Sequence, residues 1–291
     1  KVTGMGIYSG LTIETFLDPK KQPFLYDHQI NGTPVLPGVM GIEALVECAQ
    51  LLFPDRYAGS VEDVRFLVPF KFFRNEPRTL QLRADFRMDG KDIVADCRLI
   101  GSRVLHGHTE PEVTTHFSGV VRLLEQPLKV GKRARINLPV VDKQAKAEDI
   151  YRIYFHGPAY RVMECAWRAG NEFYGLSAIH LPANHDPVEA PALIQPRLIE
   201  LCFQTASMWE LVNEQRMGLP FRVEKVCVLG LAPENGARLF SVAKPSATGG
   251  FEAVVSDVSG RVYLEVHGYQ TMQLPDAVDA QLVQPLRSVL G

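Results

Sequence analysis

The amino-acid sequence predicts an α+β protein in which one arrangement, an apolar helix followed by four strands, occurs twice. Segments that alternate between apolar and polar residues outnumber segments with helical periodicity, and such alternation is typical of strands with one buried face. The 291 residues are enough for two domains of moderate size. A helix packed on an antiparallel sheet, present twice, agrees with both observations.

The first half contains one predicted helix, over residues 38–52. Val39, Ile42 and Leu45 recur there at helical intervals, and Pro37 before them suits the fixed φ of a helix start. Four predicted strands follow the helix, over residues 61–73, 79–88, 92–101 and 114–124. The sequence MDGKD joins the second of these strands to the third and predicts a hairpin turn. We therefore interpret residues 1–128 as the first domain.

The second half repeats this order after a polar stretch. Residues 129–145 are basic, interrupted by proline and without a sustained period, so we interpret them as a linker. A second domain over residues 146–291 contains a predicted helix over residues 196–212. Four predicted strands follow this helix, over residues 221–230, 237–245, 251–260 and 261–272. The Ser-Gly pair between the last two strands predicts a second hairpin.

The composition is that of a globular protein with a hydrophobic core. Hydrophobic residues make up 46% of the chain and charged residues 22%, with a formal net charge of −2. This charge gives no reason to expect nucleic acid or an anionic membrane as a partner. No apolar run reaches the roughly 18 residues that a membrane-spanning helix needs. Because the first residue is Lys1, we expect the chain to be a piece of a longer protein.

The cysteines and glycines of the chain indicate no bound cofactor. The five cysteines are scattered and form no Cys-x-x-Cys pair, so neither a disulfide framework nor a metal site is predicted. Free thiols favour a reducing, cytoplasmic location. Glycine-rich phosphate-binding loops are absent from the sequence, so no nucleotide cofactor is expected.

A candidate catalytic group precedes the first helix. His28 is followed by Gly32 after three residues, by Pro37 after four more, and then by Gly38. Imidazole titrates near neutral pH and is a frequent general base. A helix N-terminus presents unpaired backbone N–H groups that bind an oxyanion. A base placed upstream of such a helix start indicates a catalytic site.

A helix wrapped by an antiparallel sheet, with His-x₃-Gly-x₄-Pro at its start, resembles the hot-dog fold. Two such units in one chain are similar to the double hot-dog dehydratase domain of polyketide synthases. The resemblance also rests on HGPAYR at 156–161, PRLIELCFQ at 196–204 and DVSGRVYLEVHGYQ at 257–270. It implies that His28 is the catalytic base and that the Gly38 amide, which follows Pro37, binds the thioester oxygen of the substrate.

The resemblance implies the removal of water from a 3-hydroxyacyl thioester, within a polyketide synthase or a synthase of the kind that makes polyunsaturated fatty acids. No cofactor is expected, because the substrate is carried on the phosphopantetheine arm of an acyl carrier protein. The expected partners are this carrier protein, other synthase domains and a second copy in a homodimer. Two alternatives remain: a product-template-type cyclase of a poly-β-keto chain, and a non-catalytic acyl-binding domain.

The expected catalytic acid is Glu200, which the resemblance places where the family carries an aspartate. The family pattern Pro-x₃-Asp-x₃-Gln reads Pro196, Glu200, Gln204 here, so the acid is one methylene longer. The apolar helix around it should raise the pKa of Glu200, and Gln204, one turn further on, could orient its carboxyl. The alternative is that Glu200 marks the solvent face of the helix. His156 replaces a tyrosine that is common in the family, and we expect it and Gln204 to lie at the substrate site.

Glu43 is the alternative acid. It lies five residues after Gly38, where single hot-dog dehydratases of fatty-acid synthesis often carry their acid. In those dimers the base and the acid come from opposite subunits, so a covalent double copy would pair His28 with Glu200. Glu43 would then face a second, vestigial site or solvent.

Overall fold

The computed structural model divides the chain into two compact units. Unit 1 contains residues 1–127 and 183–194, and unit 2 contains residues 128–182 and 195–291. The structure describes residues 1–6, 8–104, 110–132, 135, 143–190, 192–233, 237–273 and 278–291. Much of the predicted linker, 129–145, lies outside the described residues. The segment 183–194, within the predicted second domain, belongs to unit 1.

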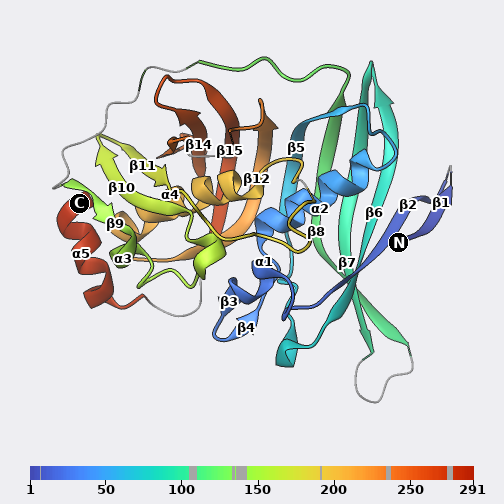
Figure 1. Ribbon diagram of the computed structural model, residues 1–291, viewed down its shortest axis with the longest axis horizontal. Helices are drawn as coiled ribbons and strands as arrows, with labels where there is room; N and C mark the ends of the chain where they lie inside the picture. The colour runs from blue at the N-terminus through green and yellow to red at the C-terminus, as the bar shows by residue number, and fades with distance from the viewer. Residues whose placement is uncertain are drawn as a thin grey trace. The chain divides into compact units, whose positions relative to one another are not determined.

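Unit 1 is an antiparallel sheet with one long helix on it (Figure 1). Its strands, in sheet order, are β1 (Val2–Gly6), β2 (Gly10–Leu17), β6 (Arg78–Asp89), β7 (Asp92–Val104), β8 (Pro111–Leu124) and β5 (Tyr57–Phe66). The remaining elements are α1 (Pro23–Tyr26), the hairpin of β3 (Gln29–Ile30) and β4 (Thr33–Pro34), α2 (Gly38–Gln50) and the 3₁₀ helix η1 (Phe73–Asn75). The predicted helix and the MDGKD hairpin are confirmed, whereas β1 and β2 were not predicted.

The first predicted strand of unit 1, over residues 61–73, is wrong beyond Phe66. The chain leaves the sheet there, and the N–H groups of Leu67 and Val68 both reach the carbonyl oxygen of His116. Pro69 follows and has no N–H to continue a strand ladder. Of the apolar residues after β5, Phe70 and Phe72 are buried in the core, whereas Leu67, Val68 and Phe73 are exposed.

Helix α2 packs closely on the sheet of unit 1 because Gly41 has no side chain to separate the helix from the Phe117 ring. Its apolar stripe, including Val39, Ile42 and Leu45, is buried. A Cβ added at Gly41 would lie 2.1 Å from a ring carbon of Phe117. The ring of Phe117 packs edge-on against Phe66 at a centroid distance of 5.4 Å. The first turn of the helix is therefore fixed against this aromatic pair.

Unit 2 repeats the arrangement, so the predicted α+β class is confirmed (Figure 1). Its strands, in sheet order, are β12 (Gly218–Val228), β15 (Val262–Gln273), β14 (Phe251–Asp257), β13 (Leu239–Pro245), β11 (Glu172–Ser177), β10 (Met163–Ala169) and β9 (Ala145–Lys146). Its helices are α3 (Ala147–Ile150), the 3₁₀ helix η3 (Pro158–Tyr160), α4 (Pro196–Glu214) and α5 (Ala280–Leu290). The predicted helix and the Ser-Gly hairpin are confirmed; β10, β11 and α5 were not predicted.

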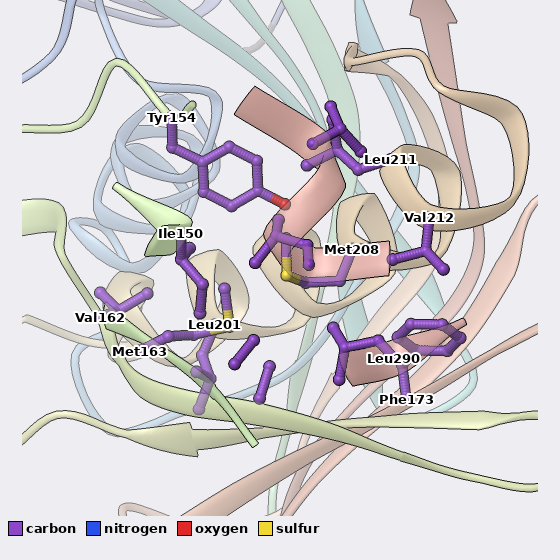
Figure 2. Packing of buried hydrophobic residues seen from close by; sticks show 14 residues of the cluster. Ile150, Tyr154, Val162, Met163, Phe173, Leu201, Met208, Leu211, Val212 and Leu290 are labelled. Carbon is purple, nitrogen blue, oxygen red and sulfur yellow. The ribbon is translucent and has the colours of Figure 1, made fainter. Parts of the chain in front are cut away.

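One face of α4 is anchored in a hydrophobic core that Figure 2 shows from close by. Leu201, Met208 and Leu211 of this helix meet side chains of α3, of the β10–β11 hairpin and of α5. The Arg287 side chain on α5 also donates from Nε to the carbonyl oxygen of Val212 at 2.9 Å. The core fixes the rotation of α4, and with it the positions of the polar residues on its neighbouring face.

In the part of the chain that the structure describes, no helix has the length and apolarity needed to cross a membrane.

Gly41→Ala should lower the thermal unfolding midpoint, because its methyl group would overlap the Phe117 ring. Overpacking a core costs about 1–3 kcal/mol, which outweighs the roughly 1 kcal/mol that alanine gains over glycine in a helix. We expect differential scanning calorimetry to show a fall of about 2–8 °C. Gly4→Ala is the matched control, since its methyl group would meet Thr12 at 3.7 Å. Equal midpoints for the two variants would contradict the packing argument.

Candidate functional site

The spacing of the His-x₃-Gly-x₄-Pro motif is that of a tight hairpin. Strands β3 and β4 pair through Gln29 with Pro34 and Ile30 with Thr33. The two turn residues, Asn31 and Gly32, have φ values of 50° and 74°. Two-residue hairpins need this left-handed backbone, and Asn-Gly is the pair that adopts it most readily. Gly32 therefore allows the turn that brings the chain back toward His28.

The hairpin places His28 opposite Val35. The Val35 N–H donates to the carbonyl oxygen of His28 at 3.0 Å, and the imidazole Nδ1 lies 2.7 Å from the carbonyl oxygen of Val35. A carbonyl only accepts, so Nδ1 carries the hydrogen. In the neutral ring Nε2 then keeps its lone pair, which is the tautomer that removes a proton through Nε2. The histidine is 8% exposed.

The strand that supplies this carbonyl is itself held in place by the segment after β5. The Leu36 N–H donates to Phe70 at 3.0 Å, and the Phe72 N–H donates to Pro34 at 2.9 Å. Val35 also forms a bridge with Lys71. Residues 34–36 are thus clamped on both sides, which fixes the orientation of the imidazole.

Helix α2 begins two residues after this clamp. Pro37 is its N-cap residue and provides no side-chain cap. The N–H groups of Met40 and Gly41 return to the Pro37 carbonyl, whereas the first two N–H groups, those of Gly38 and Val39, have no acceptor within the helix by geometry. These donors lie at the positive end of the helix dipole and can bind an oxyanion.

Only glycine fits at position 38, where the start of α2 lies against the Phe66 ring. A Cβ at this position would come within 2.7 Å of a ring carbon of Phe66. Phe66 itself is buried and packed against Phe117, so it has little room to move. The glycine therefore lets the first amide of α2 approach the sheet closely.

Glu43, the alternative acid, is not on a solvent-facing surface. The side chain is 1% exposed, and its carboxylate accepts the N–H groups of Leu193 at 2.5 Å and Ile194 at 3.1 Å. Burial raises the pKa of Glu43 to about 7, although the two N–H donors lower it. Of the two expected positions of Glu43, a vestigial site or solvent, the solvent position is therefore wrong. In this structure the carboxyl ties the segment 183–194 to α2.

In unit 2, Glu200 and Gln204 lie on α4 and are both buried. Their exposed fractions are 6% and 3%, so the alternative that Glu200 marks a solvent face is wrong. The helix starts after Gln195, which has a left-handed backbone, and Pro196 occupies its first turn. The Gln195 amide also forms two hydrogen bonds with the backbone of Ala232, which secures the helix start.

The Gln204 side chain is oriented by Tyr151. The Tyr151 hydroxyl accepts the N–H of Met163 at 2.8 Å and donates to Gln204 Oε1 at 2.9 Å. Burial raises the pKa of Tyr151 well above its usual range, so the hydroxyl keeps its hydrogen. Gln204 Nε2 must therefore point the other way, where it donates to Glu200 Oε1 at 2.8 Å and to the Tyr160 carbonyl at 3.0 Å.

His156 is the second partner of the Glu200 carboxyl. Its Nε2 lies 3.1 Å from Glu200 Oε1, and its ring stacks on Phe155 at a centroid distance of 4.5 Å. Gln204 and His156 thus both contact the same oxygen of the carboxyl, Oε1. His156 thus contacts the predicted acid at the position where the resembled family commonly has a tyrosine.

Val35 orients the predicted base and Tyr151 orients the predicted partner of the acid, and neither residue was predicted from the sequence. The Asn31-Gly32 pair was a usable signal for the first, since it predicts a hairpin that returns the chain to His28. Tyr151 precedes Gln204 by 53 residues, and no local pattern connects the two.

Two family models match the chain. One, described as "Polyketide synthase dehydratase domain", matches residues 7–93. The other, described as "Polyketide synthase dehydratase N-terminal domain", matches residues 132–281, which lie in the second half of this chain. Among curated proteins, the polyketide synthase ThaG of Burkholderia thailandensis is 21% identical over 263 residues. The match covers 86% of this chain and spans 4% of the length of that synthase.

Solved structures agree on the fold. The dehydratase domain from the CurF module of the curacin polyketide synthase superposes with a TM-score of 0.73 and 18% identity, covering 94% of this chain and 98% of that one. A trans-AT polyketide synthase dehydratase domain from Brevibacillus brevis has a TM-score of 0.74 and 15% identity, covering 94% and 96%. The double hot-dog fold predicted from the sequence is confirmed.

Glu43→Gln should change the pH dependence of stability in unit 1. With a pKa of about 7 in the folded state and 4.5 as its ordinary value, Glu43 binds a proton more tightly when the protein is folded. Its contribution to stability is therefore present below pH 4.5 and is lost as the pH rises toward 7. Relative to Glu43→Gln, the wild-type protein should lose free energy of unfolding between pH 5 and pH 7.

Urea unfolding of both proteins at the two pH values measures this difference. The Glu76→Gln variant, which replaces an exposed glutamate of unit 1, serves as the control. A difference between wild type and Glu43→Gln that is the same at pH 5 and pH 7 would contradict the raised pKa.

Proposed function

Because the chain belongs to the polyketide synthase dehydratase family, we propose that it removes water from a 3-hydroxyacyl thioester carried on an acyl carrier protein. The observation that carries the proposal is the hydrogen bond from His28 Nδ1 to the Val35 carbonyl. It supports a neutral imidazole whose Nε2 acts as the base, a few residues before an oxyanion-binding helix start.

The base acts on the carbon next to the thioester carbonyl. His28 Nε2 takes the α-proton, and the electron pair of the broken C–H bond moves toward the carbonyl oxygen. The first N–H groups of α2, beginning with Gly38, would stabilise the negative charge that develops there. The closeness of Gly38 to the Phe66 ring supports this role, because it leaves no room for a side chain beside the amide.

The acid completes the elimination. We assign it to Glu200, which would donate a proton from Oε2 to the departing hydroxyl as the C–O bond breaks and the C=C bond forms. The contacts of Gln204 and His156 with Oε1 support a fixed orientation of the carboxyl. Water leaves, His28 holds the α-proton, and exchange with solvent restores both groups.

Glu43 fits the acid role less well. Its carboxyl already accepts two backbone N–H groups of the segment 183–194, and these bonds would be lost if it turned toward a substrate. We therefore assign Glu43 a positioning role within unit 1.

We further propose the partners that this reaction requires. The acyl carrier protein delivers the substrate on its phosphopantetheine arm, and the elimination is redox-neutral, so the chain needs no cofactor of its own. Other synthase domains flank the dehydratase in the longer protein, as the small share of ThaG that it matches supports, and the assembly is a homodimer. The five cysteines form no disulfide bond, which supports a cytoplasmic location.

His28→Ala should abolish dehydration, because a general base typically contributes about 10²–10⁴-fold to the rate. Single-turnover reactions with a 3-hydroxyacyl pantetheine thioester, followed by mass spectrometry, measure the loss of water. Replacement of the exposed His180 by alanine is the control. Retention of more than about a tenth of the wild-type rate by His28→Ala would exclude a general-base role. Ring formation in the same assay would instead indicate a cyclase.

Glu200→Gln should remove activity while substrate still binds, because an amide of the same shape cannot supply the proton. We expect a loss of about 10²–10⁴-fold. Glu200→Asp should keep part of the rate, since the family uses the shorter acid, but its shorter reach lowers the rate.

Glu43→Gln is the matched control for this assignment and should lower the rate much less. If Glu43→Gln stops turnover and Glu200→Gln does not, the two glutamates have been assigned in the wrong order. The dehydratase proposal would survive that result.

A further inference from the structure

Three side chains that commonly bind metals gather on one face of the unit 2 sheet. Cys227 on β12 lies directly opposite Glu265 on β15, and His267 follows two residues later, on the same face of the strand. Their candidate ligand atoms all lie within 4.8 Å of one another. Thiolate, imidazole and carboxylate are the donor groups that zinc prefers in proteins.

A fourth residue, Glu252 on β14, determines which nitrogen of His267 could bind a metal. Glu252 Oε2 lies 2.7 Å from His267 Nδ1, and the other carboxylate oxygen accepts the Gly268 N–H at 3.1 Å. The carboxylate only accepts, so Nδ1 carries the hydrogen. In the neutral ring, the Nε2 lone pair faces Glu265, at 3.4 Å from Oε2. Metal-binding histidines characteristically have such a carboxylate behind the ring.

A cation placed between His267 Nε2 and the Glu265 carboxylate would interact with both groups. When His267 is neutral, Nε2 and the Glu265 carboxylate are both acceptors at 3.4 Å. A proton on Nε2 would satisfy this pair, whereas the Cys227 sulfur, within 4.8 Å of both, adds a third atom that a metal ion can bind. A divalent metal ion would satisfy all three groups at once.

We propose that Cys227, Glu265 and His267 bind one Zn²⁺ ion, with Glu252 as the residue that orients the imidazole. Zinc–ligand bonds of about 2.0–2.3 Å place tetrahedral ligands about 3.5 Å apart, so the ligands would have to close by about 1 Å. The side chains of Glu265 and His267 are 37% and 42% exposed, which leaves them free to make this movement.

The charges on this face also favour a cation. The Cys227 thiolate, Glu265 and Glu252 would contribute three negative charges. Lys225, directly opposite His267, and Lys244, directly opposite Glu252, each contribute one positive charge. The charge that remains is negative and favours a cation. Bound there, the ion would cross-link β12 to β15 and stabilise the sheet of unit 2, a role separate from the dehydration chemistry.

Cobalt titration tests the site. Co²⁺ bound by a thiolate in a tetrahedral site gives a sulfur-to-metal charge-transfer band and intense visible bands. We expect both bands for the full 291-residue chain, stripped with a chelator, to saturate at one equivalent of Co²⁺ and to disappear when Zn²⁺ is added. Cys227→Ser should remove the charge-transfer band. Glu252→Gln should weaken Co²⁺ binding about 10–100-fold.

Cys165→Ser is the matched control, because Cys165 is another buried cysteine of unit 2, packed in an apolar cluster with Trp167 and Phe240. It should bind Co²⁺ as the wild type does. Zn²⁺ should also raise the thermal midpoint of the wild type but not of Cys227→Ser. Absence of the charge-transfer band in the wild type, or an unchanged band in Cys227→Ser, would overturn the proposal. Circular dichroism of each variant establishes that it is folded.

Discussion

The chemistry proposed for this chain depends on one short hydrogen bond, from His28 Nδ1 to the Val35 carbonyl oxygen. A neutral imidazole has two tautomers, and only the one with a bare Nε2 can remove a proton through that nitrogen. The carbonyl selects this tautomer because it cannot donate. The Asn31-Gly32 turn brings Val35 to His28, and the segment 70–72 holds Val35 in place. The turn and the segment 70–72 of unit 1 therefore fix the tautomer of His28 by holding the Val35 carbonyl in place.

Unit 2 uses the same principle for a carboxyl. The Tyr151 hydroxyl decides which end of the Gln204 amide faces Glu200, and the amide therefore donates to Oε1 of that carboxyl. In each unit, a side chain that could be donor or acceptor meets a partner that can have only one of these roles. The Val35 carbonyl can only accept from His28. The Tyr151 hydroxyl already accepts the Met163 N–H and therefore donates to Gln204. Such preorganisation is what catalytic groups require, because it avoids reorientation during the reaction.

The sequence was sufficient for the features that local patterns encode. The two long helices and the strands that follow them show in the periodicity of apolar residues, and His28 is distinguished by its spacing from Gly32 and Pro37. The bond of Glu43 to Leu193 and Ile194 could not be predicted, because it joins residues about 150 positions apart. The prediction of a strand beyond Phe66 was wrong because a local pattern was present but had another cause. Phe70 and Phe72 are apolar because they are buried, and burial alone does not distinguish a strand from an irregular core segment.

Nitrogen NMR of the histidine side chains tests the central claim most directly, because protonated and bare ring nitrogens have widely separated ¹⁵N shifts. His28 is assigned by the signals that disappear in His28→Ala, at a pH where the imidazole is neutral. The account predicts a protonated Nδ1 and a bare Nε2 for His28. A His28 ring that is protonated on Nε2, or one that exchanges between the two tautomers, would contradict it.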